Sequence, residues 1–500
     1  MHAIKSYDVQ KIPMRITTMI AAISLSDILR RPAIAAIAVV TALVIRPAAA
    51  APDAADAQAA VLQQSGQKPS SQNTRAEAQW FPDAGLGLFI HWGIASVKGE
   101  GDLSWCMLAN KSWYDATITP NDYYRLIDQW RPEEMDFDRI LGEAKAAGFQ
   151  YAVFTTKHHD GFTMWPSEFG DTGTRKSFGG RDFVKEFVEA CRRHGLKVGF
   201  YYSPPDWRFD RNYRSWSLSG KKLDMDHKEV VLPPKPVDHD RKRAELVRGQ
   251  VTELLTRYGT VDLIWFDGGK GEIPNDEVRR LQPGIVINRR NGGAGDYGDS
   301  EGKLPDKRFS GWFESCVTVW PMRKWSYSKE YPQTGAPMTL AMLSILRAWG
   351  GNLLANVGPA GDGSLPAPVR ECWNAMADWM KHSGESVIGT RPGPWPERVN
   401  VPVTMRDGAA YLHFLPRLPE NLPGLPDGEK TFTQTKQVIP PLPEYSDTAV
   451  WTDAPKPEAV TLLRTGTALP FDYTKGTLTV KLPANHRTDN VDIVKVSLKP

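Results

Sequence analysis

The chain has 500 residues, more than a single hydrophobic core usually serves, so two domains are expected. Its 61 basic and 58 acidic side chains leave a net charge of +3, which is too small to indicate a nucleic-acid partner. The 17 Trp and 15 Tyr residues are a rich supply of flat amphipathic rings, which suit sugar rings as well as core packing.

The N-terminus has the pattern of a secretory signal. An apolar run at 32–45 follows two arginines and precedes the alanines at 48–51. Signal peptides have this order: a basic region, an apolar region and a cleavage site of small residues. We expect residues 1–51 to be a signal peptide and 52–75, rich in Ala, Gln and Ser, to be a disordered tether. The expected location is the periplasm or the exterior of the cell, with no stable membrane insertion after cleavage. A retained signal anchor is the alternative.

Strand-like and helix-like segments alternate from residue 86 onward. The expected strands are 86–93, 151–157, 197–203, 260–267 and 285–290, and the expected helices are 137–147, 182–194, 239–258 and 277–281. Repeated βα alternation predicts an α/β fold with a parallel (β/α)8-like barrel, complete or incomplete, over residues 76–391. The part at 305–350 does not resolve into clear repeats. The charged, Pro-bounded stretch 206–237 is expected to lie on the catalytic rim.

The pattern changes near residue 392. Three prolines at 392, 394 and 396 indicate a linker, and short segments such as 409–415 and 478–482 then alternate apolar with polar side chains. Short alternating strands between Gly and Pro turns predict an antiparallel β-sandwich over 392–500.

Polar residues stand at the ends of three expected barrel strands. They are His91, the His158–His159–Asp160 cluster and Asp267, which ends the apolar run 260–267 ahead of two glycines. In parallel barrels the C-terminal strand ends meet at one mouth, so these side chains predict a pocket for a polyhydroxylated substrate. The plainer alternatives are a turn-capping Asp and core histidines.

Several kinds of chemistry lack their motifs. There is no second closely spaced ligand set beside His158 and His159, no Gly-x-Ser-x-Gly elbow and no Walker-type phosphate loop. We therefore expect no metal and no cofactor, and a carboxylate nucleophile with a carboxylic acid partner remains. Four widely separated cysteines predict neither a zinc site nor a disulfide framework: Cys106, Cys191, Cys316 and Cys372.

Five blocks resemble the α-L-fucosidases of glycoside hydrolase family 29. They lie, in order, at 89–93, 155–167, 261–269, 350–359 and 384–390, and the Lys-His-His-Asp-Gly-Phe sequence in the second is the most specific. The resemblance implies a retaining exo-glycosidase in which Asp267 is the nucleophile. It also implies binding roles for a set of neighbours: His91, His158 and His159 on fucose hydroxyls, Trp265 at the floor, Tyr201 or Tyr202 at the wall, and Arg290 beside the nucleophile.

Two segments depart from the family pattern. Where many members have a Ser-Glu-Trp-Tyr-like sequence, this chain has Leu-Ser-Trp-Cys at 103–106, so a hydroxyl-binding Glu is missing and only Trp105 matches. The family's Trp-Glu-x-Cys sequence is replaced by Trp-Phe-Glu-Ser-Cys at 312–316. These changes concern linkage preference more than the reaction.

Two residues could be the general acid/base. Glu301 lies in a loop rich in Gly and Asp that resembles the acid/base loop of several family members, and we rank it first. Glu314 lies among Trp312, Phe313 and Cys316, where burial could raise the pKa as an acid requires. The expected partner is a fucosylated oligosaccharide or glycoconjugate. The alternatives are a retaining glycosidase for a related sugar and a catalytically weak fucose-binding protein.

Overall fold

The computed structural model describes residues 72–100, 103–109, 118–218, 220–305, 307–321, 324–329, 333–417 and 445–499. The expected signal peptide and most of the expected tether lie outside the described residues. The expected tether 52–75 ends too late in the prediction, because Asn73 is buried in the fold. Its side-chain amide donates to the carbonyls of Pro283 and Ile285, both at 3.0 Å. Among the described residues, no helix combines the length and apolar character needed to cross a membrane.

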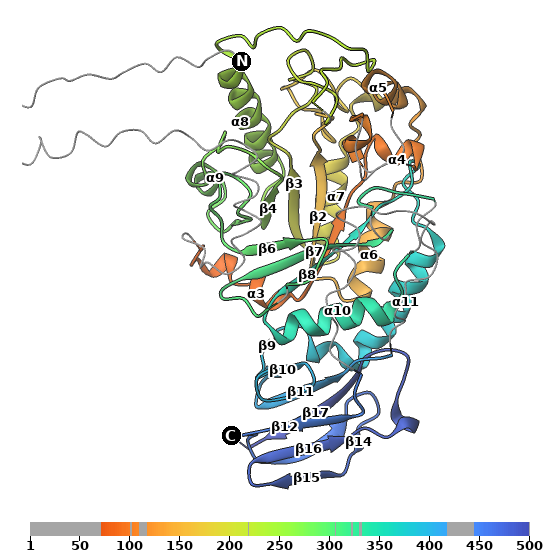
Figure 1. The fold of residues 1–500 in the computed structure, drawn as a ribbon, viewed down its shortest axis with the longest axis vertical. Coiled ribbons are helices and arrows are strands. Elements are labelled where there is room, and N and C mark those ends of the chain that lie inside the picture. The colour runs from red at the N-terminus through yellow and green to blue at the C-terminus, as the bar shows by residue number, and fades with distance from the viewer. Residues whose placement is uncertain are drawn as a thin grey trace, which may run out of the picture. The chain divides into compact units, whose positions relative to one another are not determined.

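An eight-stranded parallel sheet forms the larger part of the fold (Figure 1). Its strand order is β5-β4-β3-β2-β1-β8-β7-β6, which confirms the predicted barrel-like α/β architecture. The strands are β1 Leu86–Ile90, β2 Tyr151–Lys157, β3 Lys197–Tyr202, β4 Leu263–Phe266, β5 Val286–Ile287, β6 Gly298–Glu301, β7 Phe313–Trp320 and β8 Asn352–Val357.

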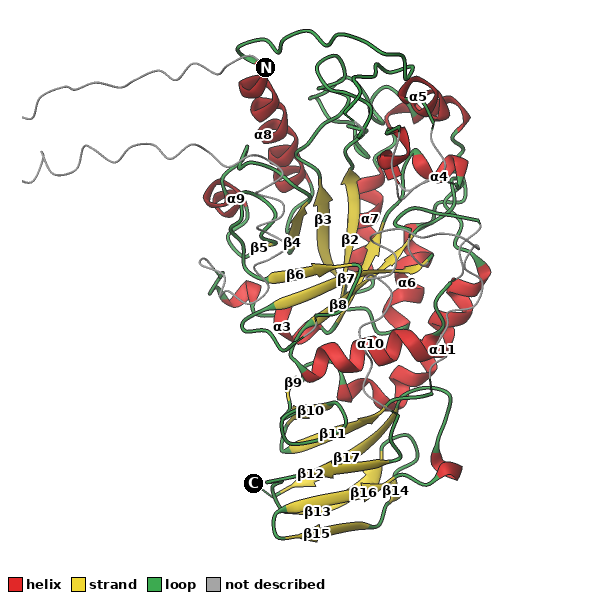
Figure 2. Ribbon diagram, viewed as in Figure 1, coloured by secondary structure: helices red, strands yellow, loops and turns green. Residues whose placement is uncertain are grey.

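Helices flank this sheet (Figure 2). They are α3 Phe81–Ala84, α4 Ala95–Lys98, α5 Pro120–Gln129, α6 Phe137–Ala146, α7 Phe183–Arg193, α8 His239–Arg257, α9 Asn275–Leu281, α10 Ala336–Ala348 and α11 Ala367–Ser383, with short 3-10 turns at Ala76–Ala78, Leu103–Met107, Phe178–Gly180, Gly384–Ser386 and Ala484–His486.

The regular part of the barrel follows from its sequence. Every residue of β1, β2 and β8 is buried, as expected for strands covered on both faces. Helix α7 begins where the Asp182 side chain accepts a hydrogen bond from the Lys185 amide, and it ends just before Gly195, which has a left-handed φ of 63°. These boundaries agree with the predicted helix 182–194.

The barrel is irregular between β5 and β7. Strand β5 has only two residues, and the structure describes no helix between β5 and β6 or between β6 and β7. Strands β5 and β6 are the two edges of the sheet, and the gap between them is spanned by a single parallel bridge from Asn288 to Tyr297. The Asp296 carboxylate helps to hold this bridge, because its Oδ2 accepts from the Ile287 amide at 2.7 Å.

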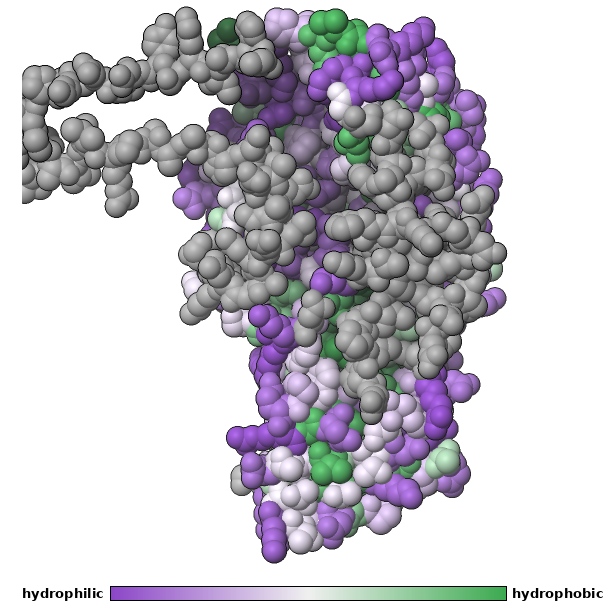
Figure 3. Space-filling model, viewed as in Figure 1, coloured by the Kyte–Doolittle hydropathy of each residue, from purple (hydrophilic) through white to green (hydrophobic). Residues whose placement is uncertain are grey.

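Two antiparallel sheets follow, which confirms the predicted β-sandwich. The six-stranded sheet has the order β14-β13-β17-β11-β10-β9 and the three-stranded sheet the order β12-β16-β15. Their strands are β9 Arg391–Pro392, β10 Val403–Arg406, β11 Ala409–Phe414, β12 Thr448–Trp451, β13 Pro457–Leu462, β14 Thr467–Ala468, β15 Phe471–Thr474, β16 Thr477–Lys481 and β17 Asp492–Leu498. Polar and apolar side chains mix on the visible face of these sheets (Figure 3).

The boundary between the barrel and the sandwich stays a prediction. Pro392, expected in a linker, lies in β9, an edge strand, where a residue without an N–H group is tolerated. All four cysteines are buried and unpaired in the structure.

Candidate active site

Asp267 lies at the centre of a cluster of polar side chains at the C-terminal ends of β1 to β4. Tyr201 Oη donates a hydrogen bond to Asp267 Oδ2 at 2.6 Å, and His159 Nε2 lies 3.5 Å from the same oxygen. On the other side, Arg290 Nη1 lies 3.6 Å from Asp267 Oδ1. The Asp267 side chain is 26% exposed, whereas Tyr201 and His159 are buried. The carboxylate is therefore held by its neighbours and remains open to a ligand.

Each predicted histidine is oriented through its Nδ1 atom. His91 Nδ1 lies 2.6 Å from Asn356 Oδ1, and the Asn356 amide group is itself fixed by donating to the carbonyl of Trp325 at 2.8 Å. His91 Nδ1 therefore carries the proton, which leaves Nε2 as an acceptor for a substrate hydroxyl. Burial lowers the pKa of His91 to about 3, so the ring is neutral at ordinary pH.

The two histidines after β2 are held by serines. His158 Nδ1 lies 2.6 Å from Ser104 Oγ, and His159 Nδ1 lies 2.5 Å from Ser203 Oγ. Burial and neighbouring positive charges lower the pKa of His159 to about 3 and that of His158 well below its usual value. Both rings are therefore uncharged hydrogen-bonding groups rather than cations.

Aromatic rings pack beside the polar cluster around Asp267. The Tyr201 ring stacks on Trp265, with ring centres 5.7 Å apart, and on His158, with ring centres 5.6 Å apart. Tyr202, the alternative that the resemblance offered for the wall, lies on the opposite face of β3, where its hydroxyl donates to Gln250 Oε1 of α8 at 2.7 Å. Successive residues of a strand face opposite sides, so only Tyr201 can line the pocket.

Arg290 joins the nucleophile side of the pocket to Glu301. Its Nη1 atom donates to Glu301 Oε2 at 2.6 Å and lies 3.6 Å from Asp267 Oδ1, so both carboxylates contact one nitrogen atom. Asp299 binds the same guanidinium, and Arg290 lies over the Trp265 ring at 4.4 Å. Burial opposes the charge of Arg290, but the surrounding carboxylates raise its pKa. Glu301, the last residue of β6, is 38% exposed.

Glu314 lies deep in the barrel. It is the second residue of β7, far from the C-terminal strand end, and it is 0% exposed. Its Oε2 accepts from Tyr151 Oη at 2.6 Å, and its Oε1 accepts from Trp265 Nε1 at 3.1 Å. Burial raises its pKa to about 7. The carboxyl group thus braces the floor of the pocket from below.

Three residues next to the pocket were not predicted. The Trp207 ring stacks on His159 with ring centres 5.0 Å apart, and the Trp325 ring lies 5.0 Å from His91. Ser104, in the segment where the family's Glu is missing, holds His158. The predicted Trp105 packs edge-on against both His159 and Trp207. The contacts of these residues join segments that are far apart in the chain, so no local pattern predicts them. The one sequence signal was the expectation that 206–237, which contains Trp207, lies on the catalytic rim.

The ligand atoms of His158, His159 and Asp267 lie within 4.8 Å of one another, a spacing that could hold a metal ion. Tyr201, Ser104 and Ser203 already orient these three groups toward a shared space. Neutral imidazoles beside a carboxylate can bind sugar hydroxyls without a metal ion. The absence of a metal from this site therefore stays a prediction.

A barrel with two carboxylates at its mouth defines a glycoside hydrolase class of site. A family model described as Alpha-L-fucosidase matches residues 54–385, and the chain belongs to this family, glycoside hydrolase family 29. It is 27% identical to the tissue alpha-L-fucosidase of Rattus norvegicus over 407 residues, covering 72% of this chain and 82% of the relative. The human tissue enzyme is 28% identical over 396 residues, covering 70% and 78%.

Solved structures show the same fold. The alpha-L-fucosidase isoenzyme 1 from Paenibacillus thiaminolyticus superposes with a TM-score of 0.69 at 25% identity, covering 85% of this chain and 99% of that one. A Bacteroides thetaiotaomicron alpha-L-fucosidase, trapped as a covalent intermediate, has the same TM-score at 24% identity, covering 87% and 99%.

Proposed function

We propose that the protein is an exo-acting, retaining α-L-fucosidase that removes terminal α-L-fucose from glycans. The observation that carries the proposal is the shared contact of Asp267 and Glu301 with Arg290 Nη1, at 3.6 and 2.6 Å. A retaining glycosidase needs two carboxyl groups about 5 to 5.5 Å apart, and two carboxylates on one nitrogen atom are compatible with that separation.

In this mechanism Asp267 is the nucleophile. Its Oδ2 accepts from Tyr201 at 2.6 Å, which leaves Oδ1 to attack the anomeric carbon. Burial raises the pKa of Tyr201 well above its usual value, so the phenol stays protonated and keeps donating. Attack on the anomeric carbon breaks the glycosidic bond and gives a covalent fucosyl-enzyme, which water then hydrolyses.

Glu301 is the proposed general acid and base. It gives a proton to the leaving oxygen in the first step and takes one from water in the second. Its exposure and its place at the end of β6 support this role, because the group must exchange protons with solvent and reach the leaving group. Glu314, 0% exposed under Trp265, lacks that access. We propose a structural role for it.

The neutral histidines are the proposed hydroxyl-binding groups. With Nδ1 of His91, His158 and His159 occupied by Asn356, Ser104 and Ser203, each ring offers its Nε2 to the sugar. Binding by uncharged histidines adds no cation, besides Arg290, to the positive charge that develops at the anomeric centre.

Replacement of Asp267 with Gly tests the nucleophile. We expect hydrolysis of 4-nitrophenyl α-L-fucoside to fall by several orders of magnitude, since the covalent step is lost. Added azide should enter the vacated space and give a fucosyl azide of inverted configuration. Activity close to that of the wild type would refute the assignment. A wild-type protein that hydrolyses only a related glycoside would refute the substrate.

We also propose that the protein is exported after cleavage of a signal peptide, which rests on the sequence pattern at 30–51. N-terminal sequencing of the native protein should begin between Ala49 and Ala57. A mature chain that starts at Met1 in the cytoplasm would contradict this proposal.

A further inference from the structure

Arg214 is a partly buried cation that forms no ion pair with any residue that the structure describes. Its guanidinium lies over two indole rings, 4.1 Å from the centre of Trp207 and 4.8 Å from that of Trp216. With the residues that the structure describes, Arg214 makes no ion pair and no hydrogen bond, and its Nε atom is buried without a partner. Burial lowers its pKa to about 10, so it remains charged at neutral pH. Buried charged side chains are usually paired with an opposite charge, so an unpaired Arg214 calls for an explanation.

The position of Arg214 connects it to the active site. Trp207 stacks on His159, whose Nε2 lies 3.5 Å from the nucleophile Asp267. The Arg214 guanidinium lies over the same Trp207 ring, 4.1 Å from its centre. Together with burial and Lys157, the charge of Arg214 also lowers the pKa of His159. A row of side chains thus leads from the nucleophile to a partly exposed cation.

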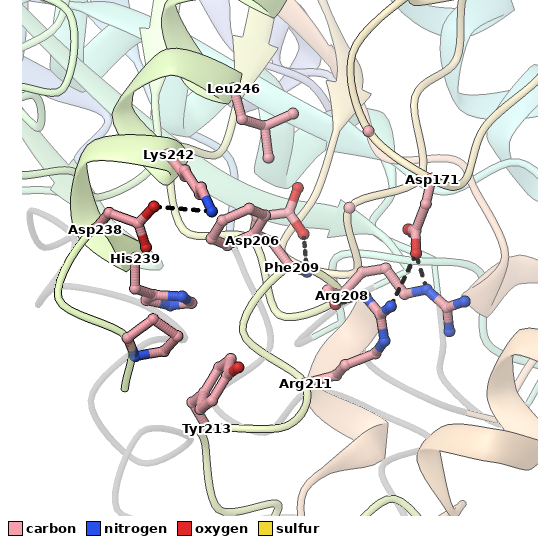
Figure 4. Close-up of a pocket in the computed structure, with 13 residues that line it drawn as sticks. Asp171, Asp206, Arg208, Phe209, Arg211, Tyr213, Asp238, His239, Lys242 and Leu246 are labelled. Atoms are coloured by element: carbon pink, nitrogen blue, oxygen red, sulfur yellow. Dashed lines mark hydrogen bonds and ion pairs between the residues drawn. The ribbon is translucent and has the colours of Figure 1, made fainter. Parts of the chain in front are cut away.

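The neighbouring cations of the same segment are paired. Figure 4 shows Arg208 and Arg211 turned toward Asp171 at the edge of a cavity of about 420 Å³, each with a nitrogen 3.2 Å from a carboxylate oxygen. Asp210, the carboxylate whose charge acts on Arg214, is already bound by His239 at 2.7 Å and by Arg243 at 3.4 Å. Asp210 therefore acts on Arg214 only at a distance, and no carboxylate among the described residues forms an ion pair with it.

We propose that Arg214 recognises an anionic group, a sulfate ester or a carboxylate, on the sugar next to the fucose in the substrate. This inference rests on the proposed fucosidase function and names its substrate class. A guanidinium binds both groups through two parallel N–H bonds, and stacking on Trp207 holds its plane in place beforehand. Trp105, edge-on to Trp207 and partly exposed, offers an apolar surface beside it for the same sugar.

The test compares matched substrates. The value of kcat/KM is measured for a neutral α-fucosylated trisaccharide, for its sulfate ester and for its sialylated form, and each anionic substrate is expressed as a ratio to the neutral one. We expect a ratio of about ten in the wild type for at least one anionic substrate, the usual size of a hydrogen bond to a charged group. This ratio should fall toward one in Arg214→Gln and keep part of its size in Arg214→Lys. In the wild type it should decrease as the salt concentration rises from about 0.05 to about 0.5 M.

Arg211→Gln is the control, because it removes the same charge three residues away from a group that already has a partner. It should keep the wild-type ratio. A wild-type ratio near one for both anionic substrates would overturn the inference, and so would a ratio that Arg214→Gln and Arg214→Lys leave unchanged. A preference for only one substrate supports the inference and identifies the anion. A failure to hydrolyse any fucoside, including 4-nitrophenyl fucoside, would instead refute the proposed function.

Discussion

The two halves of the barrel differ in regularity and in what they contribute to the site. Strands β1 to β4 are separated by helices, and their ends supply His91, the two histidines after β2, Tyr201 and Asp267. Strands β5 to β7 follow one another without a described helix (Figure 2). These strands and the residues just after them supply Arg290, Glu301 and Glu314. The groups proposed to bind the sugar thus come from the regular half, and the candidates for proton transfer from the irregular half.

This division has a physical reason. Hydroxyl recognition needs donors and acceptors fixed in place, which buried strands with oriented histidines provide. An acid/base must reach the leaving oxygen and exchange protons with water, which suits the exposed end of β6. We infer that the irregular half is adapted to proton transfer, and the following variants can break or sharpen this comparison.

Among the variants that compare the two halves, the largest effect is expected for Glu301→Ala. In Glu301→Ala, kcat/KM on natural oligosaccharides should fall about 10² to 10⁴-fold, the usual contribution of general acid catalysis, with a much smaller loss on fucosyl fluoride. Glu314→Ala is the matched comparison and should not show this dependence on the leaving group. If Glu314→Ala alone shows the selective loss, the proposed roles of the two residues are exchanged.

The two tyrosines at the end of β3 provide the next test. Tyr201→Phe removes the 2.6 Å hydrogen bond to Asp267, and we expect kcat/KM to fall about tenfold, as for a hydrogen bond to a charged group. Tyr202→Phe removes only the bond to Gln250 on the other face, so it should lower the free energy of unfolding by about 1 kcal/mol and leave the kinetics unchanged. Equal kinetic losses in both variants would contradict the placement of Tyr201 alone in the pocket.

A smaller effect concerns stability and pH. Burial raises the pKa of Glu314 to about 7, above its value in the unfolded chain, so its protonated form is favoured by folding. Its contribution is therefore fully present at low pH and is lost as pH rises between about 4.5 and about 7, by at most about 1.4 kcal/mol per pH unit. Relative to the wild type, Glu314→Gln should gain stability over this range in thermal unfolding. A difference that is constant with pH would show that Glu314 is ionised throughout.

The sequence predicted the regular half well. Buried strands with a polar residue just after the last apolar position located His91, His158, His159 and Asp267 at one mouth, because parallel strands share their direction. It did not distinguish Tyr201 from Tyr202, since a shift of one residue reverses which side chain faces the pocket.

The irregular half was harder to predict for an equally physical reason. Glu301 and Glu314 both lie in strands, and their difference is depth: Glu301 ends β6, whereas Glu314 is second in β7. Because the boundaries of β6 and β7 were not predicted, the sequence could not show how far each carboxyl group lies from the C-terminal end of its strand. The contacts of Ser104, Trp207 and Arg214 join segments that are distant in the chain, and no local pattern predicts them.

The central claim, a covalent intermediate on Asp267, is tested most directly by trapping it. The wild-type protein would be incubated with 2-fluoro-fucosyl fluoride, and its intact mass and its proteolytic peptides measured by mass spectrometry. We predict one added fluorofucosyl group per chain, located on the peptide that contains Asp267, and none in Asp267→Gly. An adduct on Glu301 or Glu314, or a mass that stays unchanged while the enzyme still releases fluoride, would contradict the account.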